Sequence, residues 1–402
     1  MQVNMFSDIV SSTDEAIDLI RKNTDSSSTA ECLILFTTGD DIEPESVFRG
    51  IRESHPDLMI YGGHTIGIFT ENILTYSENA ICGIFLYNCE ILSHFSCNLS
   101  QDLSTGGKEC GDKFSAHSEP GNILLLYDSV CSRNEKSDDI RINSSAKILS
   151  GILSSIINKE SIFGAGLVKN FSFDNSVIFC GDKCGYDCLC ALNFPDLAFH
   201  TKIMHGCTPV SGYYHRITDC SDDIIREIDG RPATEVIDEI FGNTEWQSEI
   251  PISLLTIGIN KGKKYTPFKE ENFINRLILS TMPGSKSIRM FESDLKTGDE
   301  FIFMKRKHAS MFHSVKKNTT QAIRELKSSD KIPLFAFVFD CAGRTKKQSF
   351  TDKEESSIAI KILKNENIPI IGLYTGVEIA PIKDHSRGLD WTSVLAIAYE
   401  KK

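Results

Sequence analysis

The sequence predicts an α/β protein with α+β character: two domains of mixed β-sheets covered by helices, built from repeated strand–helix–strand units plus β-hairpins. Three observations predict this class. An apolar strand, a polar loop, a helix and a second apolar strand that ends on glycine recur three times. The strands are continuously apolar, as expected for strands that are buried under helices. The chain has 402 residues, 41% of them hydrophobic, and is therefore long enough for two cores.

A helix is expected to open the chain. Ser12 and Glu15 have the spacing of a capping box, and Ala16, Ile17 and Ile20 lie on one helical face. The three repeats follow. They run from LILFTTGD (33–40) through a helix near 45–53 to LMIYGG (58–63), from ILLLYDSV (123–130) through INSSAKILSGILSSII to SIFGAG (161–166), and from PLFAFVFDCAGR (333–344) through EESSIAIKILKN to IPIIGLYTG (368–376).

Other segments predict antiparallel additions. Residues 73–88 and 176–194 each show two strands flanking a turn, which is typical of a β-hairpin. In EIDGRPATEVIDEIFG, an Asp-Gly turn and Pro232 precede a helix with Val236 and Ile237 on one face.

The patterning is weakest between residues 193 and 228, and we place the domain boundary there. The predicted organisation is an N-terminal helix and lead-in over 1–30, one domain over 31–218 and a second over 219–402.

Composition bears on partners and on compartment. A net charge of −12 argues against nucleic acid or an anionic membrane as the main partner, because both require clustered basic residues. The N-terminus lacks the basic-then-apolar order of a signal peptide, and no apolar run approaches the roughly 20 residues of a membrane span. Thirteen cysteines, an odd number spread over a long chain, favour free thiols in a reducing cytoplasm.

Five motifs appear in a fixed order: IYGGHTIGIF, IFGAGLVKN, REIDGRPATEVIDEIFG, VFDCAGR and GLYTGVEIAPI. This ordered series resembles the FIST family (F-box and intracellular signal transduction), which has an N-terminal and a C-terminal FIST domain. The similarity covers nearly the whole chain, with the two domains falling over 31–218 and 219–402. Each motif alone is mostly glycine and aliphatic residues, so the specificity lies in their order and spacing.

The resemblance implies a cytoplasmic sensory protein that binds a small amino-acid-like metabolite without turning it over. The signal would pass in trans to an effector of the histidine kinase, chemoreceptor or cyclase type. Some bacterial members are haem proteins that sense nitric oxide, so a haem-based sensor is an alternative. An enzyme acting on a small metabolite and a protein-recognition scaffold are further alternatives. Two departures bear on ligand choice: Val377 precedes Glu378, and Asp390 and Trp391 stand where relatives tend to carry Asn and Gln.

Ligands of α/β layers bind beyond the carboxyl ends of strands, where loops present polar groups. Arg344 is suited to grip a carboxylate and Glu378 to meet an ammonium group, which together fit a zwitterion. The alternative is a purely structural role, in which Arg344 and Glu378 form an ion pair with each other and the glycines permit tight turns. The predicted ligand-binding residues are Gly62, Gly63, His64, Thr65, Gly164, Asp340, Arg344, Tyr374 and Glu378; Thr37, Thr38, Asp40, Asp128, Ser129 and Arg133 are further loop candidates.

Motifs for other chemistry are weak. GGHTIG fits neither the dinucleotide nor the phosphate loop pattern. For His64 within it, the sequence favours a structural histidine over a ligand contact. No sequence spacing identifies a haem ligand, and His205 and His215 are the most plausible candidates. No catalytic motif is present, and Cys341, with Arg344 nearby to lower its pKa, reads first as a small residue at the edge of the core. No resident cofactor is therefore assigned.

The stretch CGDKCGYDCLC carries four cysteines in eleven residues, 180–190. Its spacing matches neither zinc knuckles nor the usual iron–sulfur runs. Cys188 and Cys190 face the same side of a strand, and free cysteine packs as a small hydrophobe. The sequence favours core packing within a hairpin, with a metal site and redox chemistry as alternatives.

Overall fold

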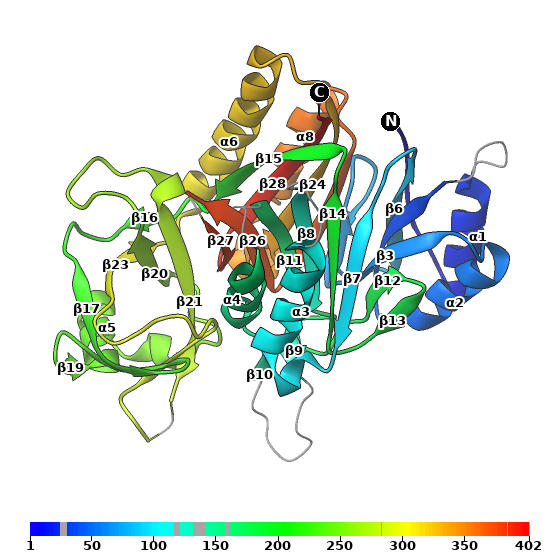
Figure 1. The fold of residues 1–402 in the computed structure, drawn as a ribbon. Coiled ribbons are helices and arrows are strands. Elements are labelled where there is room, and N and C mark those ends of the chain that lie inside the picture. The colour runs from blue at the N-terminus through cyan, green and yellow to red at the C-terminus, as the bar shows by residue number, and fades with distance from the viewer. Residues whose placement is uncertain are drawn as a thin grey trace.

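The computed structural model describes residues 1–24, 30–115, 121–131, 141–156, 161–282, 284–383 and 385–401. Three six-stranded sheets form a main body, and a β-barrel stands beside it (Figure 1). Each of the three predicted repeats forms a parallel strand pair within its own sheet. The predicted α/β class with mixed sheets and covering helices is confirmed.

The first sheet is built around the first repeat, in the order β1-β6-β2-β3-β12-β13. Helices α1 and α2 cover one face and share a core with Leu33, Leu35 and Phe85 of the sheet. The elements are β1 (Gln2–Ile9), α1 (Thr13–Asn23), β2 (Cys32–Thr38), α2 (Pro44–Ser54), β3 (Met59–His64), β6 (Ala80–Tyr87), β12 (Ile178–Gly181) and β13 (Lys183–Gly185).

The second sheet is built around the second repeat, in the order β27-β26-β11-β8-β14-β7. Helices α3 and α4 pack on each other and bury Phe114 and Ile148 against Leu125 of the sheet. The elements are β7 (Leu92–Cys97), α3 (Leu103–Ser115), β8 (Asn122–Asp128), α4 (Ser145–Ser155), β11 (Ser161–Leu167), β14 (Cys188–Phe194), β26 (Val377–Ile382) and β27 (His385–Leu389); the short pair β9 (Val130–Cys131) and β10 (Arg141–Ile142) lies apart.

The third sheet is built around the third repeat, in the order β15-β28-β24-β25-β4-β5. Helices α6 and α8 cover it, with Ile323 and Leu363 packed against Val338. The elements are β4 (Gly67–Phe69), β5 (Leu74–Thr75), β15 (Leu197–Met204), α6 (His308–Ser328), β24 (Pro333–Cys341), the short helix α7 (Lys346–Ser349), α8 (Ser356–Asn365), β25 (Ile370–Thr375) and β28 (Ser393–Glu400).

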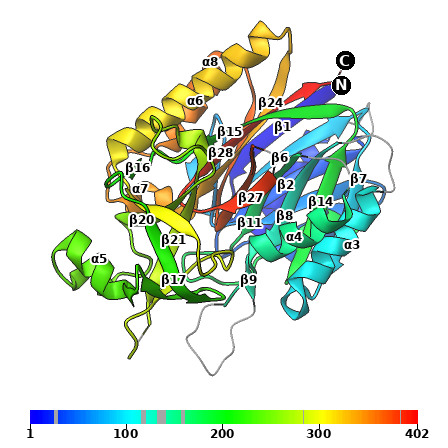
Figure 2. The same ribbon diagram turned by 60° about the vertical axis from the view of Figure 1, so that its left-hand side comes forward.

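The inner faces of the three sheets share one core, in which Phe36, Phe163 and Phe339 lie together. The helices stay outside this core: Figure 2 shows α6 and α8 on one side of the strands and α3 and α4 on the other. Burial of aromatic and aliphatic side chains between the sheets is therefore the main source of stability of the body.

After each repeat the chain crosses into a neighbouring sheet. Strand β4 leaves the first repeat and pairs with β25 of the third, β12 leaves the second and pairs with β3, and β26 leaves the third and pairs with β11. The three crossings form a closed cycle, so the second and third sheets mix strands from both sides of residue 218.

Residues 208–305 supply the barrel, which the sequence did not predict. Its strands follow the order β16-β23-β17-β18-β22-β21-β20, and β20 also pairs with β23, which closes the ring. Ile225, Trp246 and Phe301 lie in its core. The elements are β16 (Thr208–Pro209), β17 (His215–Ser221), β18 (Ile224–Ile228), β19 (Arg231–Pro232), α5 (Ala233–Phe241), β20 (Leu255–Asn260), β21 (Phe273–Thr281), β22 (Ile288–Met290) and β23 (Glu300–Lys305).

Local signals read from the sequence had mixed outcomes. The capping prediction is confirmed, since the Ser12 side chain accepts a hydrogen bond from the Glu15 N–H. The turn at Asp229 and Gly230 is also confirmed, with φ of 54° and 75°, and α5 follows it after the short strand β19. The prediction that a helix opens the chain is wrong, because β1 precedes α1 and pairs with β6.

Both predicted hairpins are wrong in part. Strands β5 and β6 of residues 73–88 lie in different sheets. In residues 176–194, β12 turns back on β13, but β14 crosses into the second sheet and lies between β8 and β7. Strand propensity was correctly read in these segments, but tertiary contacts decide which neighbour each strand pairs with.

The cysteine-rich stretch mainly fills the core. Cys180, Cys188 and Cys190 are buried in the shared core of the three sheets. The prediction of free thiols is wrong for one pair, because Cys188 faces Cys97 across β14 and β7 and forms a disulfide with it. Within the described ranges, no three His, Cys, Asp or Glu side chains are arranged to hold a metal ion. Nor does any helix in those ranges combine the length and apolar character needed to cross a bilayer.

Candidate functional site

A pocket of about 310 Å³ lies where the three crossings meet. Every crossing contributes to its lining: Ile66 lies between β3 and β4, Gly376 lies between β25 and β26, and the crossing from β11 to β12 supplies Val168, Asn170, Phe171 and Phe173. The barrel closes the other side through Glu249, Ile250, Pro251, Ser253, Leu277 and Phe291. The pocket is therefore built jointly by the barrel and the main body, at the lower end of the volume range typical of small-molecule sites.

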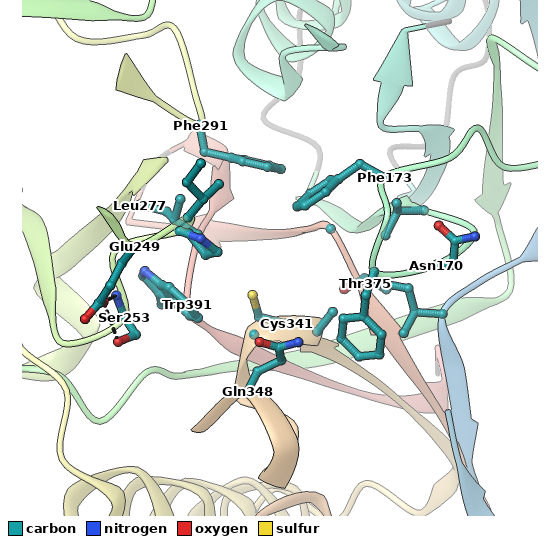
Figure 3. Close-up of a pocket in the computed structure, with 18 of the residues that line it drawn as sticks. Asn170, Phe173, Glu249, Ser253, Leu277, Phe291, Cys341, Gln348, Thr375 and Trp391 are labelled. Carbon is teal, nitrogen blue, oxygen red and sulfur yellow. Dashed lines mark hydrogen bonds between the residues drawn. The ribbon is translucent and has the colours of Figure 1, made fainter. Parts of the chain in front are cut away.

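Aromatic side chains form most of its wall. Phe171, Phe173, Phe291, Phe350 and Trp391 all line it. In Figure 3, Phe291 and Phe173 lie on one side of the space, with Trp391, Cys341 and Gln348 opposite them. Such walls favour a ligand with an apolar or aromatic body, because stacking and burial of apolar surface supply the binding energy.

Trp391 offers an unused hydrogen-bond donor in this wall. Its indole Nε1 is buried and has no partner, although buried Trp N–H groups usually find one. The guanidinium of Arg306 stacks on the ring at 3.6 Å from the ring centroid. Arg306 is held there because it donates to the carbonyls of Ser253 (2.8 Å) and Gly343 (3.1 Å). A ligand acceptor at Trp391 would therefore sit near a fixed positive charge.

Glu249 supplies the negative charge of the lining. One oxygen of its carboxylate accepts from the backbone N–H (3.0 Å) and the hydroxyl (2.9 Å) of Ser253, so the side chain is fixed in place. The lining carries no lysine or arginine among the residues that the structure describes. The pocket thus combines a carboxylate with neutral donors, an arrangement suited to an amine.

Cys341 points its sulfur toward the centre of the pocket (Figure 3). Burial, with the nearby Glu378, raises the pKa of this thiol well above its usual value, so the sulfur stays protonated. This shift is opposite to the lowering expected from Arg344, and it favours the interpretation of Cys341 as a residue at the edge of the core rather than a nucleophile.

Arg344 lies beneath the pocket rather than in its wall. Its buried guanidinium pairs through Nε with Glu355 and, at 3.1 Å, with Asp340. Its Nη1 donates to the carbonyls of His205 (3.0 Å) and Trp391 (2.8 Å). The residues that separate Asp340 from Arg344, namely 341–343, do line the pocket. Arg344 and Asp340 therefore hold the turn that forms the pocket floor.

Glu378 and Tyr374 are also enclosed. The Glu378 carboxyl accepts a hydrogen bond from the hydroxyl of Thr375 (2.9 Å), and burial raises its pKa well above the usual range. The hydroxyl of Tyr374 contacts Ser356 (2.7 Å) and Glu354 (3.2 Å). Neither residue lines the pocket, whereas Thr375 and Gly376 between them do.

The predicted residues of the first two crossings are structural neighbours of the pocket. Thr65 links two crossings, since its hydroxyl donates to the Tyr374 carbonyl at 2.5 Å. Gly62 and Gly164 have φ of 126° and 140°, and a Cβ on Gly164 would lie 2.0 Å from the Leu125 carbonyl oxygen. A Cβ on Gly63 would meet the carbonyl oxygen of Val177 at 2.4 Å. These three glycines permit close strand packing, which agrees with the structural role given as the alternative in the sequence analysis.

The further loop candidates hold the crossings in place. The Thr38 hydroxyl donates to the Ile66 carbonyl (2.8 Å), and the carboxylate of Asp128 accepts from the backbone N–H groups of Val130, Ser176 and Asp187. Arg133 lies outside the described residues. The aromatic lining residues Phe171, Phe173 and Phe291 carried no sequence signal, because isolated phenylalanines in loops form no motif.

His64 is a buried structural histidine. Its Nδ1 lies 2.9 Å from the Thr37 hydroxyl, and its Nε2 has no partner. Burial, aided by Lys169, lowers its pKa to about 3, so the ring is neutral in the folded protein. The unfolded chain, with a pKa of about 6.5, binds the proton more readily at mildly acidic pH. Stability associated with His64 is therefore present above about pH 6.5 and is lost as the pH falls toward the folded pKa.

This linkage gives a testable slope. Between about pH 6 and 4, the unfolded state binds one more proton than the folded state. The free energy of unfolding therefore falls by about 1.4 kcal/mol for each unit by which the pH is lowered. In His64→Met this contribution is absent, so the pH dependence of urea unfolding is expected to be shallower by about that amount. Equal slopes in the two proteins would show that His64 titrates normally in the fold.

The two histidines considered for haem do not fit that role in this pocket. His205 uses both ring nitrogens, since Nε2 bonds the Glu270 carbonyl (3.0 Å) and Nδ1 accepts from the Cys207 N–H (2.9 Å). The Nδ1 of His215 pairs with Asp229 at 2.7 Å. Neither residue lines the pocket, and no histidine is among its lining residues in the described chain.

Comparison with protein-family models identifies two domains in the chain. The model of the FIST N domain matches residues 31–231, and that of the FIST C domain matches residues 233–381. Curated proteins gave no match to the chain. The pocket takes residues from both matched ranges, and the predicted resemblance is confirmed. With the two domain models together spanning most of its length, this chain belongs to the FIST family, whose domains act as sensors in signal transduction.

Proposed function

We propose that the protein is a sensor that binds a small amine-bearing metabolite in the pocket between the barrel and the crossings, without chemical turnover. The observation that supports this most is the combination of aromatic walls, the fixed Glu249 carboxylate and the unpartnered Trp391 N–H. An ammonium group would pair with Glu249, and an acceptor such as a carboxylate or carbonyl oxygen would take the Trp391 N–H. An amino acid with an apolar side chain has all three features.

The proposal changes the role expected for Arg344 and Glu378. Both are buried and hold the turn and the crossing that shape the pocket floor, so their effect on the ligand would be indirect. Arg306, which stacks on Trp391, would instead supply a positive charge near a ligand carboxylate.

Signalling would follow from the position of the site. A ligand that contacts the barrel and the main body at once favours the relative placement in which both contacts are made. Ile250 and Phe350, which are 67% and 82% exposed, lie at the pocket and would present a changed surface to a partner. We propose a cytoplasmic effector in trans, of the histidine kinase, chemoreceptor or cyclase type implied by the family resemblance.

A thermal-shift screen with amino acids and simple amines tests the proposal. A ligand at one hundred times its dissociation constant is expected to stabilise the fold by about 2.7 kcal/mol. Gln348→Trp places a large ring in the pocket from a half-exposed position, and it is expected to abolish the shift while the protein stays folded. Glu249→Gln, which keeps the shape of the side chain but removes its charge, is expected to raise the dissociation constant for amines about tenfold or more.

Lys346→Trp is the matched control, since it adds the same ring to the same short helix but lies outside the pocket lining. Its ligand shift is expected to equal that of the unmodified protein. If Gln348→Trp kept the full shift, the ligand would bind elsewhere. If only haem gave a shift, with a Soret band, the haem alternative would replace the amine.

A further inference from the structure

A second pocket, of about 650 Å³, lies between the barrel and the body, on the side of α4 and β27. Figure 1 shows β21 of the barrel close to both elements. Its lining concentrates basic side chains in a chain whose net charge is −12. The cationic lining residues are Lys147, Lys261, Arg276, Lys296 and Arg387, and the only carboxylates among the described lining residues are Asp294 and Asp299.

Internal pairing does not balance these charges. Arg276 is buried and forms a two-bond ion pair with Asp294, at 2.7 and 2.6 Å. Within the described part of the chain, no carboxylate lies at ion-pairing distance from Lys261, Lys296 or Arg387. The pocket therefore keeps an excess of positive charge after its own pairs are formed.

Lys261 and Arg387 show this excess most directly. Burial and the charge of Arg387 lower the pKa of Lys261, although Asp294 and Asp299 act in the opposite direction. The ammonium group of Lys383 is also nearby, because it donates to the Lys261 carbonyl. Like charges held close together and only partly balanced are unfavourable, and a bound anion would relieve the repulsion.

The remaining lining suits an organic anion. Ser293 lines the pocket, and its hydroxyl is buried without a partner, so it is available as a donor. Leu149, Leu153, Ile259 and Ile274 add apolar surface beside the charges. The pocket thus offers several cations, one spare hydroxyl and an apolar wall.

We propose that this pocket binds a small organic anion that carries two or more negative charges, either a phosphate ester or a polycarboxylate. Arg387 and Lys261 pair with its anionic groups, and the Ser293 hydroxyl donates to one of its oxygens. Two separated cations favour a multiply charged ligand over a monocarboxylate, because each extra charge pair adds to the affinity. This site is distinct from the amine pocket and does not depend on it.

The test is isothermal titration of the full chain with inorganic pyrophosphate, citrate and acetate in separate arms. Saturable binding of pyrophosphate, citrate or both is expected, with acetate at least about tenfold weaker. Affinity is expected to fall as salt rises, since screening weakens the charge contacts. Pyrophosphate alone would identify the phosphate class, and citrate alone the polycarboxylate class.

Arg387→Gln and Lys261→Gln are each expected to raise the dissociation constant about tenfold. Both positions are partly exposed, so folding should survive, which thermal unfolding without ligand would check. Lys183→Gln removes an exposed lysine on β13 and is expected to leave binding unchanged. Absence of saturable binding in both multivalent arms, or equal affinity in the two pocket variants and the unmodified protein, would overturn the proposal.

Discussion

Arg344→Met is expected to lower the free energy of unfolding by about 3–5 kcal/mol, the range typical of removing one partner from a buried ion pair. The guanidinium is fully enclosed and contacts Glu355, Asp340 and the carbonyls of His205 and Trp391. Methionine fills a similar length but leaves two acids and two carbonyl oxygens without their donor. The measurement is urea unfolding at neutral pH, followed by circular dichroism.

A double-variant cycle separates the ion pair from simple packing. In the Glu355→Gln background, Arg344→Met removes a cation whose main counter-charge is already gone, so the added cost is expected to be clearly smaller. A cost below about 1 kcal/mol for Arg344→Met alone would mean that the two acids accept protons and need no cation. Arg344→Met is thus a test of the fold. Ligand binding in the pocket is tested instead by Glu249→Gln.

The sequence predicted the repeating units because their signals are local. Continuous apolar strands such as 33–38 and amphipathic helices such as 44–54 need no knowledge of distant residues. The exchange of strands among the sheets has no such signal. Nothing in the sequences of β4 (GIF), β12 (IFCG) and β26 (VEIAPI) names their partners, and only the packing of the whole body selects which neighbour each one joins.

The barrel was missed for a related reason. Its strands β17 and β18 are short and lack a regular alternation of polar and apolar residues, as HRITDCS and IIREI show, and they lie in the weakly patterned stretch where the domain boundary was placed. Ring closure depends on β20 pairing with both β21 and β23, a long-range contact. Strands without a regular apolar face give little local signal of the sheet that they join.

The loops named from the sequence reach the pocket, but the side chains named there, Asp340 and Arg344 among them, do not line it. Ligand positions beyond strand ends were expected, and residues 341–343 and 375–376 do line the pocket. Successive residues of a strand face opposite sides, so when Cys341 faces the pocket its neighbour Asp340 faces the interior. To choose between Asp340 and Cys341, one must know which face of the strand points to the pocket, and the sequence does not specify this.

Gly62→Ala is expected to cost at least about 3 kcal/mol of unfolding free energy, through strain and overpacking together. Gly62 has φ of 126°, where side-chain-bearing residues are rare, and an added Cβ would lie 2.0 Å from the carbonyl oxygen of Leu35. Leu35 lies on β2, which pairs directly with β3, so the clash cannot be relieved without separating the parallel pair of the first repeat.

Gly212→Ala is the matched control for this substitution. No atom lies within 4 Å of a Cβ at Gly212, and its φ is not in the left-handed region, so its stability is expected to change by less than about 1 kcal/mol. Urea unfolding of both variants checks the difference. Similar small losses would mean that β3 adapts to a side chain, and the glycines that end these strands would then need a reason other than close packing. A large loss of stability for Gly62→Ala alone would show that this glycine is needed for close packing of the paired strands. The same reason would then apply to Gly164 in the second repeat, because it has the same environment against Leu125.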